Sequence, residues 1–249
     1  MDVESTMLPL GTKLPEFNLR GIDEKYHKNS DFSENNGLLV MFICNHCPFV
    51  KHINKELVDF TNDLIAKNIG VIGVNSNDSS QEKYAEDSIE KMKEYAAELG
   101  YNFPYVVDED QTVAKNFTAQ CTPDFFLFNS DSELIYRGQF DFSRPGNDKP
   151  VTGESLAQAV ESYLNSNEII SPQYPSMGCN IKWKIDEEPD YFLEVKDFFT
   201  ERKNFFGILN SDNFDKKPDF LCLTKYAKKS LYKGVSPKYL VIKKKVDIL

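Results

Sequence analysis

The segment that most constrains the fold is Leu38–Ile53, LLVMFICNHCPFVKHI. Its continuous apolar run, Leu38 to Ile43, is typical of a strand buried on both faces. A short polar turn follows, and Pro48 then favours a helix start, because proline suits the first helical position. Cys47 is thereby placed at the helix cap, where unpaired N–H groups and the helix dipole stabilise an anion. The pattern predicts a thiolate nucleophile, and a buried cysteine packing as a small apolar residue is the alternative.

Turn signals and apolar spacing predict that strands and helices alternate along the rest of the chain. Gly70 and Gly100 are expected to end the first two helices, and Ser79–Glu82 has the capping-box pattern that would open the second. The expected elements are a hairpin within 14–32, strands at 71–74, 103–107, 125–129 and 134–137, and helices at 48–68, 79–100, 110–117 and 153–165. Such an order indicates an α/β sheet with parallel and antiparallel parts.

Composition narrows the class of protein. The 249 residues are 41% hydrophobic, which is ample for a packed core, and no apolar run is long enough to span a membrane. We expect a cytoplasmic location, because the N-terminus lacks a basic segment followed by an apolar one. In a reducing compartment the five cysteines favour redox chemistry, metal binding or burial over structural disulfides.

Charge is unevenly distributed. Residues 1–192 hold 16 Lys+Arg against 32 Asp+Glu, whereas 193–249 hold 13 against 7. An acidic body is a poor nucleic-acid binder, so no nucleic-acid partner is expected. The basic, aromatic-rich extension 193–249 has no assigned role, and its Cys222 is expected to be inert.

Several charged and metal-binding side chains surround the predicted nucleophile. His46, Lys51 and His52 are candidates for lowering the pKa of Cys47, or else solvated surface residues. Cys44, Cys47, His46 and His52 could bind zinc, but no second ligand pair follows, so we predict no metal. The carboxylates at 108–110 are expected to cap the helix that follows them.

The order of elements resembles the thioredoxin fold, and the segments that carry a closer resemblance are spread from Leu8 to about Phe192. They resemble redoxins of the AhpC/TSA (thiol-specific antioxidant, peroxiredoxin-like) type. This implies a central mixed sheet flanked by helices, with a redoxin domain over 8–167, its C-terminal arm over 168–192 and the extension beyond. The segments are MFICNHCPFVKHI (41–53), CTPDFFLF (121–128), LIYRGQFD (134–141), PVTGESL (150–156) and PSMGCNIKWK (175–184).

The resemblance assigns roles to particular residues. Cys47 matches the first cysteine of the thioredoxin motif and the peroxidatic cysteine, while the literal C-x-x-C, Cys44 to Cys47, is displaced toward the strand. Pro123 matches a proline that is cis and faces the active cysteine in thioredoxin-like proteins. Thr122 beside it would receive an extended thiol substrate.

The sequence also departs from true peroxiredoxins. Cys44 and Val40 replace the Thr or Ser and the Pro that precede the peroxidatic cysteine. The stabilising arginine would fall near Cys121–Thr122, where none exists, and Arg137 is the nearest in the following hairpin. Fast peroxide reduction would lose electrostatic help without these groups.

Three further cysteines are candidates for a second thiol. Cys44 could form a disulfide with Cys47. Cys121 is expected on a loop facing Cys47, or as a packing residue. Cys179 follows the last helix in a segment that could act as a flexible arm and swing back to the active site, or else carry a free thiol.

Together these features predict a thiol-dependent oxidoreductase with antioxidant, peroxiredoxin-like activity. Cys47 would attack a peroxide, and a thioredoxin-type dithiol would recycle the protein. One alternative is a thiol-disulfide oxidoreductase acting on protein disulfides, and another is a redox-inactive binding module. No cofactor and no membrane partner are implied.

Overall fold

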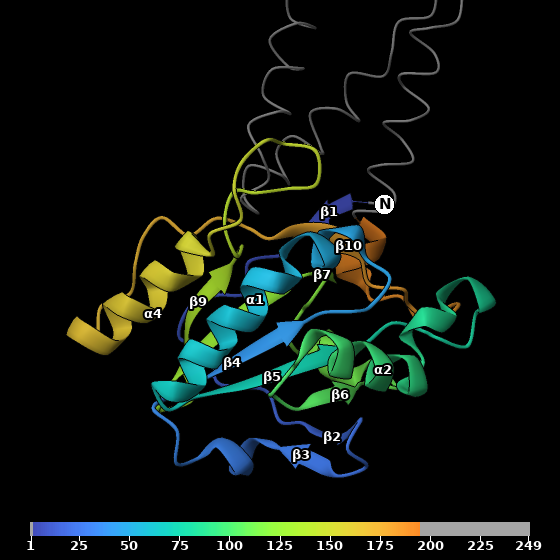
Figure 1. Cartoon of the computed structure of the whole chain (residues 1–249), viewed down its shortest axis with the longest axis horizontal. Coiled ribbons are helices and arrows are strands. Elements are labelled where there is room, and N and C mark those ends of the chain that lie inside the picture. Colours follow the sequence, from blue (N-terminus) through green and yellow to red (C-terminus); the bar gives the residue numbers. More distant parts are fainter. Residues whose placement is uncertain (1, 195–249) are drawn as a thin grey trace, which may run out of the picture. The chain divides into compact units, whose positions relative to one another are not determined.

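The computed structural model describes residues 2–194, and its central feature is the predicted mixed sheet (Figure 1). Its seven strands are ordered β3-β2-β6-β5-β4-β8-β9. β4 pairs parallel with β5 and antiparallel with β8, so the sheet has both kinds of pairing. The strands are β2 (Asn18–Gly21), β3 (Tyr26–Lys28), β4 (Gly37–Phe42), β5 (Ile69–Asn75), β6 (Tyr105–Val107), β8 (Asp124–Asn129) and β9 (Leu134–Gly138).

Helices cover the sheet and bury its apolar side chains. α1 (Pro48–Ala66) packs on β5, α2 (Ile89–Leu99) on β6, and α4 (Glu154–Ser166) on β9, while α3 (Thr112–Asn116) is short. Every residue of β4 and β5 is buried, which confirms the strands expected from the apolar runs. The core includes Leu39 and Met41 of β4, Leu57 of α1, Val71 of β5 and Leu127 of β8.

A second, three-stranded sheet of order β1-β10-β7 brings distant segments together. It consists of β1 (Asp2–Glu4), β10 (Met177–Asn180) and β7 (Cys121–Thr122), all antiparallel. The expectation that Cys179 lies on a flexible arm is wrong, because β10 pairs on both sides. Beyond it, Lys182 N–H donates to Asn77 Oδ1 over 2.8 Å.

Two predicted helix boundaries are wrong. α1 ends before Gly70, which lies within β5 opposite Leu38, and Asn68 takes the left-handed turn with φ of 58°. Ser79 does not open a long helix, because a 3₁₀ helix, η2 (Glu82–Asp87), comes first and Ser88 caps α2 instead. The chain breaks there because Asp87 is drawn into the interior, where it is 2% exposed. Gly100 ends α2 with φ of 75°, as predicted.

Buried ionisable groups contact backbone N–H groups of a helix or an oppositely charged side chain on the neighbouring strand. Asp108 accepts hydrogen bonds from the backbone N–H groups of Val113 and Ala114 in α3, as expected of a helix N-terminal partner. Arg137 of β9 is fully buried, 3.7 Å from Asp124 of β8. Among residues 2–194, no helix combines the length and apolar character needed to cross a bilayer.

The chain divides into two compact units, Met1–Glu187 and Glu188–Leu249. The predicted redoxin domain and most of its predicted arm fall in the first unit, and their boundary at 167/168 stays a prediction. The extension from 195 onward, with Cys222, lies outside the described residues.

Candidate active site

Cys47 is the N-cap residue of α1, with Pro48 as the first helical residue, as the sequence predicts. Its side chain is fully buried. The sulfur lies 3.2 Å from the Thr122 carbonyl oxygen, to which the protonated thiol donates. The Thr122–Pro123 peptide bond is cis, and the Thr122 carbonyl belongs to the last residue of β7. The structure therefore brings together Cys47, Thr122 and Pro123.

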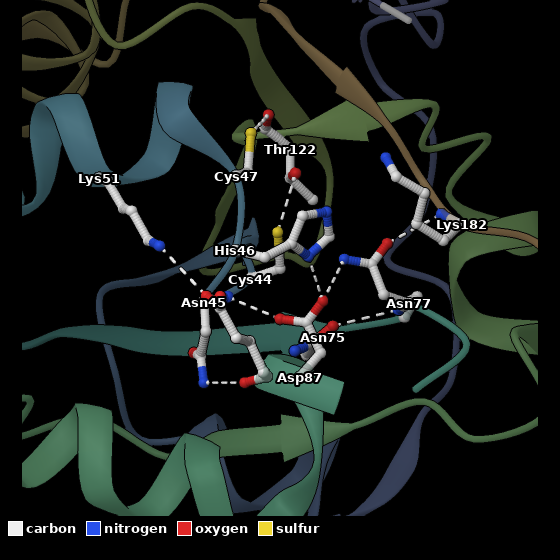
Figure 2. A network of polar contacts seen from close by, with 12 residues as sticks. Cys44, Asn45, His46, Cys47, Lys51, Asn75, Asn77, Asp87, Thr122 and Lys182 are labelled. Carbon is white, nitrogen blue, oxygen red and sulfur yellow. Dashed lines mark hydrogen bonds and ion pairs between the residues drawn. The ribbon is translucent and has the colours of Figure 1, made fainter. Parts of the chain in front are cut away.

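Cys44 is buried next to this pair. It follows the end of β4, and its sulfur is 3.2 Å from the Thr122 hydroxyl oxygen. Figure 2 shows the sulfurs of Cys44 and Cys47 at the two polar groups of Thr122, the hydroxyl and the carbonyl. Thr122 thus contacts both cysteines of the C-x-x-C sequence.

Cys179 is the third thiol at this position. In the β7–β10 pairing its backbone lies opposite Thr122, and its side chain packs against the buried cluster that includes Cys47. Among the four described cysteines it alone is partly exposed, whereas Cys44, Cys47 and Cys121 are buried.

The three thiols differ in acidity. Hydrogen bonds from the Cys179 thiol, and next from Cys44, hold the pKa of Cys47 far below its ordinary value, although burial opposes this. The backbone N–H of Val50 in the first turn of α1 adds to the effect. Burial raises the pKa of Cys44, and the hydrogen bond to Cys47 raises that of Cys179. Cys47 is therefore the most acidic of the three thiols.

Cys121 does not face Cys47 as expected. It lies in β7 next to Thr122, and adjacent residues of a strand point to opposite faces. Because Thr122 directs its hydroxyl to Cys44, the Cys121 thiol points away and donates to the Pro123 carbonyl at 3.6 Å. It is a buried packing residue in this structure.

Two of the three residues proposed to tune the pKa of Cys47, His46 and Lys51, have other partners. His46 Nδ1 is 2.5 Å from the Asp87 carboxylate, and its ring packs 5.2 Å from that of Tyr84. Lys51 forms an exposed ion pair with Glu86. In Figure 2 these side chains diverge from the Cys47 sulfur.

Asp87 is the residue of this region that sequence reasoning missed. Its carboxylate accepts from the backbone N–H of Asn45 at 2.8 Å, from His46 and from Asn77 Nδ2 at 3.0 Å (Figure 2). Asn77 in turn holds Lys182, beyond β10. Asp87 thus anchors the turn that carries Cys44 and Cys47. In the sequence, Asp87 is only a polar residue directly before the helix cap Ser88, and nothing there indicates that it is buried.

We expect Asp87→Asn to destabilise the fold by about 2 kcal/mol, because it removes charge-assisted hydrogen bonds. Burial opposes ionisation of Asp87, but the hydrogen bond and charge of His46 outweigh it, so its pKa is lowered. The wild-type advantage should be complete above the pKa of the unfolded aspartate and vanish as pH falls through the folded one. Urea unfolding from neutral to acid pH measures this, and a pH-independent difference would contradict it.

Cys44, His46 and Asp87 also form the kind of group that could hold a metal ion, because their ligand atoms all lie within 4.8 Å of one another. Both oxygens of Asp87 already accept hydrogen bonds, and the His46 nitrogen in this contact is one of the donors. Structural zinc sites have four ligands, so this group alone does not match one.

A small pocket adjoins Pro123 and the first turns of α1. His52 faces it, and within the described residues His52 Nε2 has no hydrogen-bond partner. Arg144, which sequence reasoning did not consider, lines the same pocket, whereas Arg137 is committed to Asp124. The lining also includes Phe49, Phe140 and Met177.

Comparison with known proteins is consistent with this site. The model of the AhpC/TSA family matches residues 10–137. An uncharacterized conserved protein of Geobacillus kaustophilus is 48% identical, with a TM-score of 0.72, over 75% of this chain and 98% of its own. A hypothetical protein of Sinorhizobium meliloti is 40% identical, with a TM-score of 0.71, over 73% and 98%.

A more distant structure shows the fold alone. A provisionally assigned thiol:disulfide interchange protein, DsbE, of Chlorobium tepidum is 18% identical, with a TM-score of 0.50, over 64% of this chain and 99% of its own. No curated protein matches. The fold is thioredoxin-like, and the family match covers half of the sequence. This chain belongs to the AhpC/TSA family.

Proposed function

We propose that this protein is a thiol-dependent oxidoreductase that reduces small hydroperoxides, with the Cys47 thiolate as nucleophile. Family membership supports a redox function. The observation that carries the proposal is the setting of Cys47, a buried helix-cap sulfur 3.2 Å from the Thr122 carbonyl oxygen and next to the buried thiol of Cys44. Cys179 and Cys44 hold the pKa of this sulfur far below its ordinary value, and only a small oxidant fits a side chain with no exposed surface.

The chemistry needs no group beyond the thiols. The Cys47 thiolate attacks one peroxide oxygen, the O–O bond breaks, and the other oxygen leaves as an alcohol or water after taking a proton. Cys47 becomes a sulfenic acid, which a second thiol converts to a disulfide with loss of water. A dithiol protein of the thioredoxin type would then restore both thiols by exchange.

Exchange with protein disulfides is the second candidate. It is favoured by the Thr122 carbonyl at the Cys47 sulfur, since the family resemblance implies that this segment receives an extended thiol substrate. Against it, β10 of the same chain already pairs with Thr122, where an extended substrate would bind. A protein substrate would have to displace β10, whereas a hydroperoxide would not.

We expect hydrogen peroxide to oxidise Cys47 much faster than it oxidises a free thiolate, with a rate that changes little from pH 6 to pH 8. A free cysteine has a pKa of about 8.5, so its thiolate fraction, and with it its oxidation rate, rises roughly tenfold per pH unit below that value. The pKa of Cys47 is held far below its ordinary value, so its rate should not rise in this way. Stopped-flow fluorescence of Trp183, the only tryptophan and four residues after Cys179, would follow the reaction.

Two variants calibrate this measurement. Cys47→Ser should abolish the reaction, and Cys121→Ser, which removes a buried thiol directed elsewhere, should retain it. A wild-type rate no faster than that of a free thiolate would reject hydroperoxide as the substrate and leave disulfide exchange. A binding module would instead keep its partner after Cys47→Ser. The expected thioredoxin-type reductant and the cytoplasmic location stay predictions.

A further inference from the structure

We propose that β10 is a built-in partner strand that presents Cys179 to Cys47, so that oxidation joins these two residues in an intramolecular disulfide. The inference deepens the proposed function and rests on it for the oxidant. It identifies Cys179, rather than Cys44 or Cys121, as the second thiol that converts the Cys47 sulfenic acid to a disulfide. It also gives the β7–β10 pairing a role in the reaction.

The strand register carries the first part of the argument. Cys179 lies directly opposite Thr122 in the antiparallel β7–β10 pair. The Thr122 carbonyl is 3.2 Å from the Cys47 sulfur, and Cys179 packs against the buried cluster that includes Cys47. Figure 1 shows β10 between β1 and β7, and β10 also packs against α1, the helix that Cys47 caps. The two thiols therefore already lie side by side in the reduced protein.

Close backbone approach fixes this arrangement. A Cβ atom added to Gly178 would lie 2.0 Å from the Thr122 carbonyl oxygen and 3.1 Å from the Pro123 nitrogen. Only glycine lets β10 reach the cis-proline segment. β1 pairs with the other edge of β10, where Val3 lies opposite Gly178. Beyond the strand, the N–H of Ile181 donates to the Gln120 carbonyl at 3.0 Å.

The competing thiols are placed less favourably. Cys121 donates to the Pro123 carbonyl, away from Cys47. Cys44 lies in the same buried cluster as Cys47, but it is almost fully buried and its sulfur contacts the Thr122 hydroxyl. A disulfide within Cys44–Cys47 would bury both sulfurs, where a reducing protein has no access. Cys179 is a partly exposed residue, so a disulfide with it would lie nearer the protein surface.

The reaction balances with the hydroperoxide as the only oxidant. Once Cys47 is a sulfenic acid, the Cys179 sulfur attacks the Cys47 sulfur. The S–O bond breaks, the oxygen leaves as water with the Cys179 proton, and the disulfide forms. For reduction, an external thiolate attacks the Cys179 sulfur and expels the Cys47 thiolate. The sulfur with the more acidic thiol is the better leaving group.

Peptide mapping of the full-length chain tests the assignment. After one equivalent of hydrogen peroxide, mass spectrometry of the non-reduced protein should find Cys47 linked to Cys179 in the wild type and equally in the matched controls Cys121→Ser and Cys222→Ser. Cys44→Ser should form the same disulfide more slowly, because Cys44 helps to hold down the pKa of Cys47. In Cys179→Ser this disulfide should be lost, and dimedone should label a Cys47 sulfenic acid. A wild-type disulfide from Cys47 to any other cysteine would overturn the inference.

A second oxidant separates the two proposals. Diamide converts neighbouring thiols to disulfides without a peroxide. If diamide links Cys47 to Cys179 but peroxide oxidises neither, the proposed hydroperoxide reaction fails and the placement of Cys179 stands. If Cys179→Ser forms the labelled sulfenic acid but the wild-type disulfide joins other cysteines, the proposed function stands and the inference about β10 fails. Circular dichroism of each variant confirms that the fold is retained.

Discussion

Gly178→Ala is expected to slow formation of the Cys47–Cys179 disulfide by about a hundredfold, because displacing reacting groups by about 1 Å has an effect of that size. The added methyl group would meet backbone atoms of Thr122 and Pro123, which have no freedom to rotate away. β10 must therefore move off β7. The first oxidation step should be slowed less than disulfide formation, because Cys47 loses the effect of Cys179 on its pKa but keeps its place at the cap of α1 and the effect of Cys44. Dimedone labelling and non-reducing peptide mapping would measure the two steps separately.

Gly100→Ala is the matched control for this variant. Gly100 has φ of 75°, so alanine is strained there, but nothing lies within 4 Å of the added Cβ. It should cost about 1 kcal/mol of stability and leave the disulfide rate unchanged. Wild-type disulfide kinetics in Gly178→Ala would show that β10 does not need its close approach to Thr122. The idea of β10 as a built-in partner strand would then lose its geometric basis.

The second large effect is expected at Asp124, the residue after Pro123. Burial raises the pKa of Asp124 to about 7, although the nearby Arg137 guanidinium works in the opposite direction. Cys121 and Tyr136 also lie within its electrostatic reach. In the unfolded chain the carboxyl ionises near its ordinary value, so between about pH 4 and pH 7 the folded state binds more protons. Stability must therefore fall as pH rises through this range.

Asp124→Asn should remove this pH dependence. Relative to the variant, the wild type should lose about 4 kcal/mol between pH 4 and pH 7, since a shift of about three units corresponds to that energy. Urea unfolding of both proteins at several pH values measures the difference between their free energies of unfolding. Other titrating groups contribute equally to both proteins, so their effect cancels in this difference. Parallel curves would mean that Asp124 ionises normally and that Arg137 compensates fully for burial.

Local patterns were sufficient to predict the central part of the fold. The apolar run before Cys47 and the Cys-Pro start of α1 predicted β4, the turn and the helix, because burial and proline geometry act over short stretches. The positions of Cys47, Thr122 and Pro123 followed from the family resemblance. These residues lie on adjoining elements, and the pairing of β4 with β8 brings them together.

Long-range pairing explains what the sequence could not predict. The strand β10 is four residues long and contains Gly178, so neither periodicity nor propensity marks it as a strand. It pairs with β1, whose residues lie far away in the chain, and no local pattern in the sequence predicts such a pairing. From the sequence, a flexible arm was therefore expected to carry Cys179. Asp87 was missed for the same reason, because its partners Asn45 and Asn77 lie on other loops.

The β7–β10 pairing also determines the kinetic order of the reaction. Because the second thiol belongs to the same compact unit as Cys47, closure of the disulfide is unimolecular. Its rate constant should not change on dilution, and no encounter with another copy of the chain is needed. Such a protein would complete its oxidation as efficiently at low abundance as at high, and only its recycling would depend on the concentration of a partner.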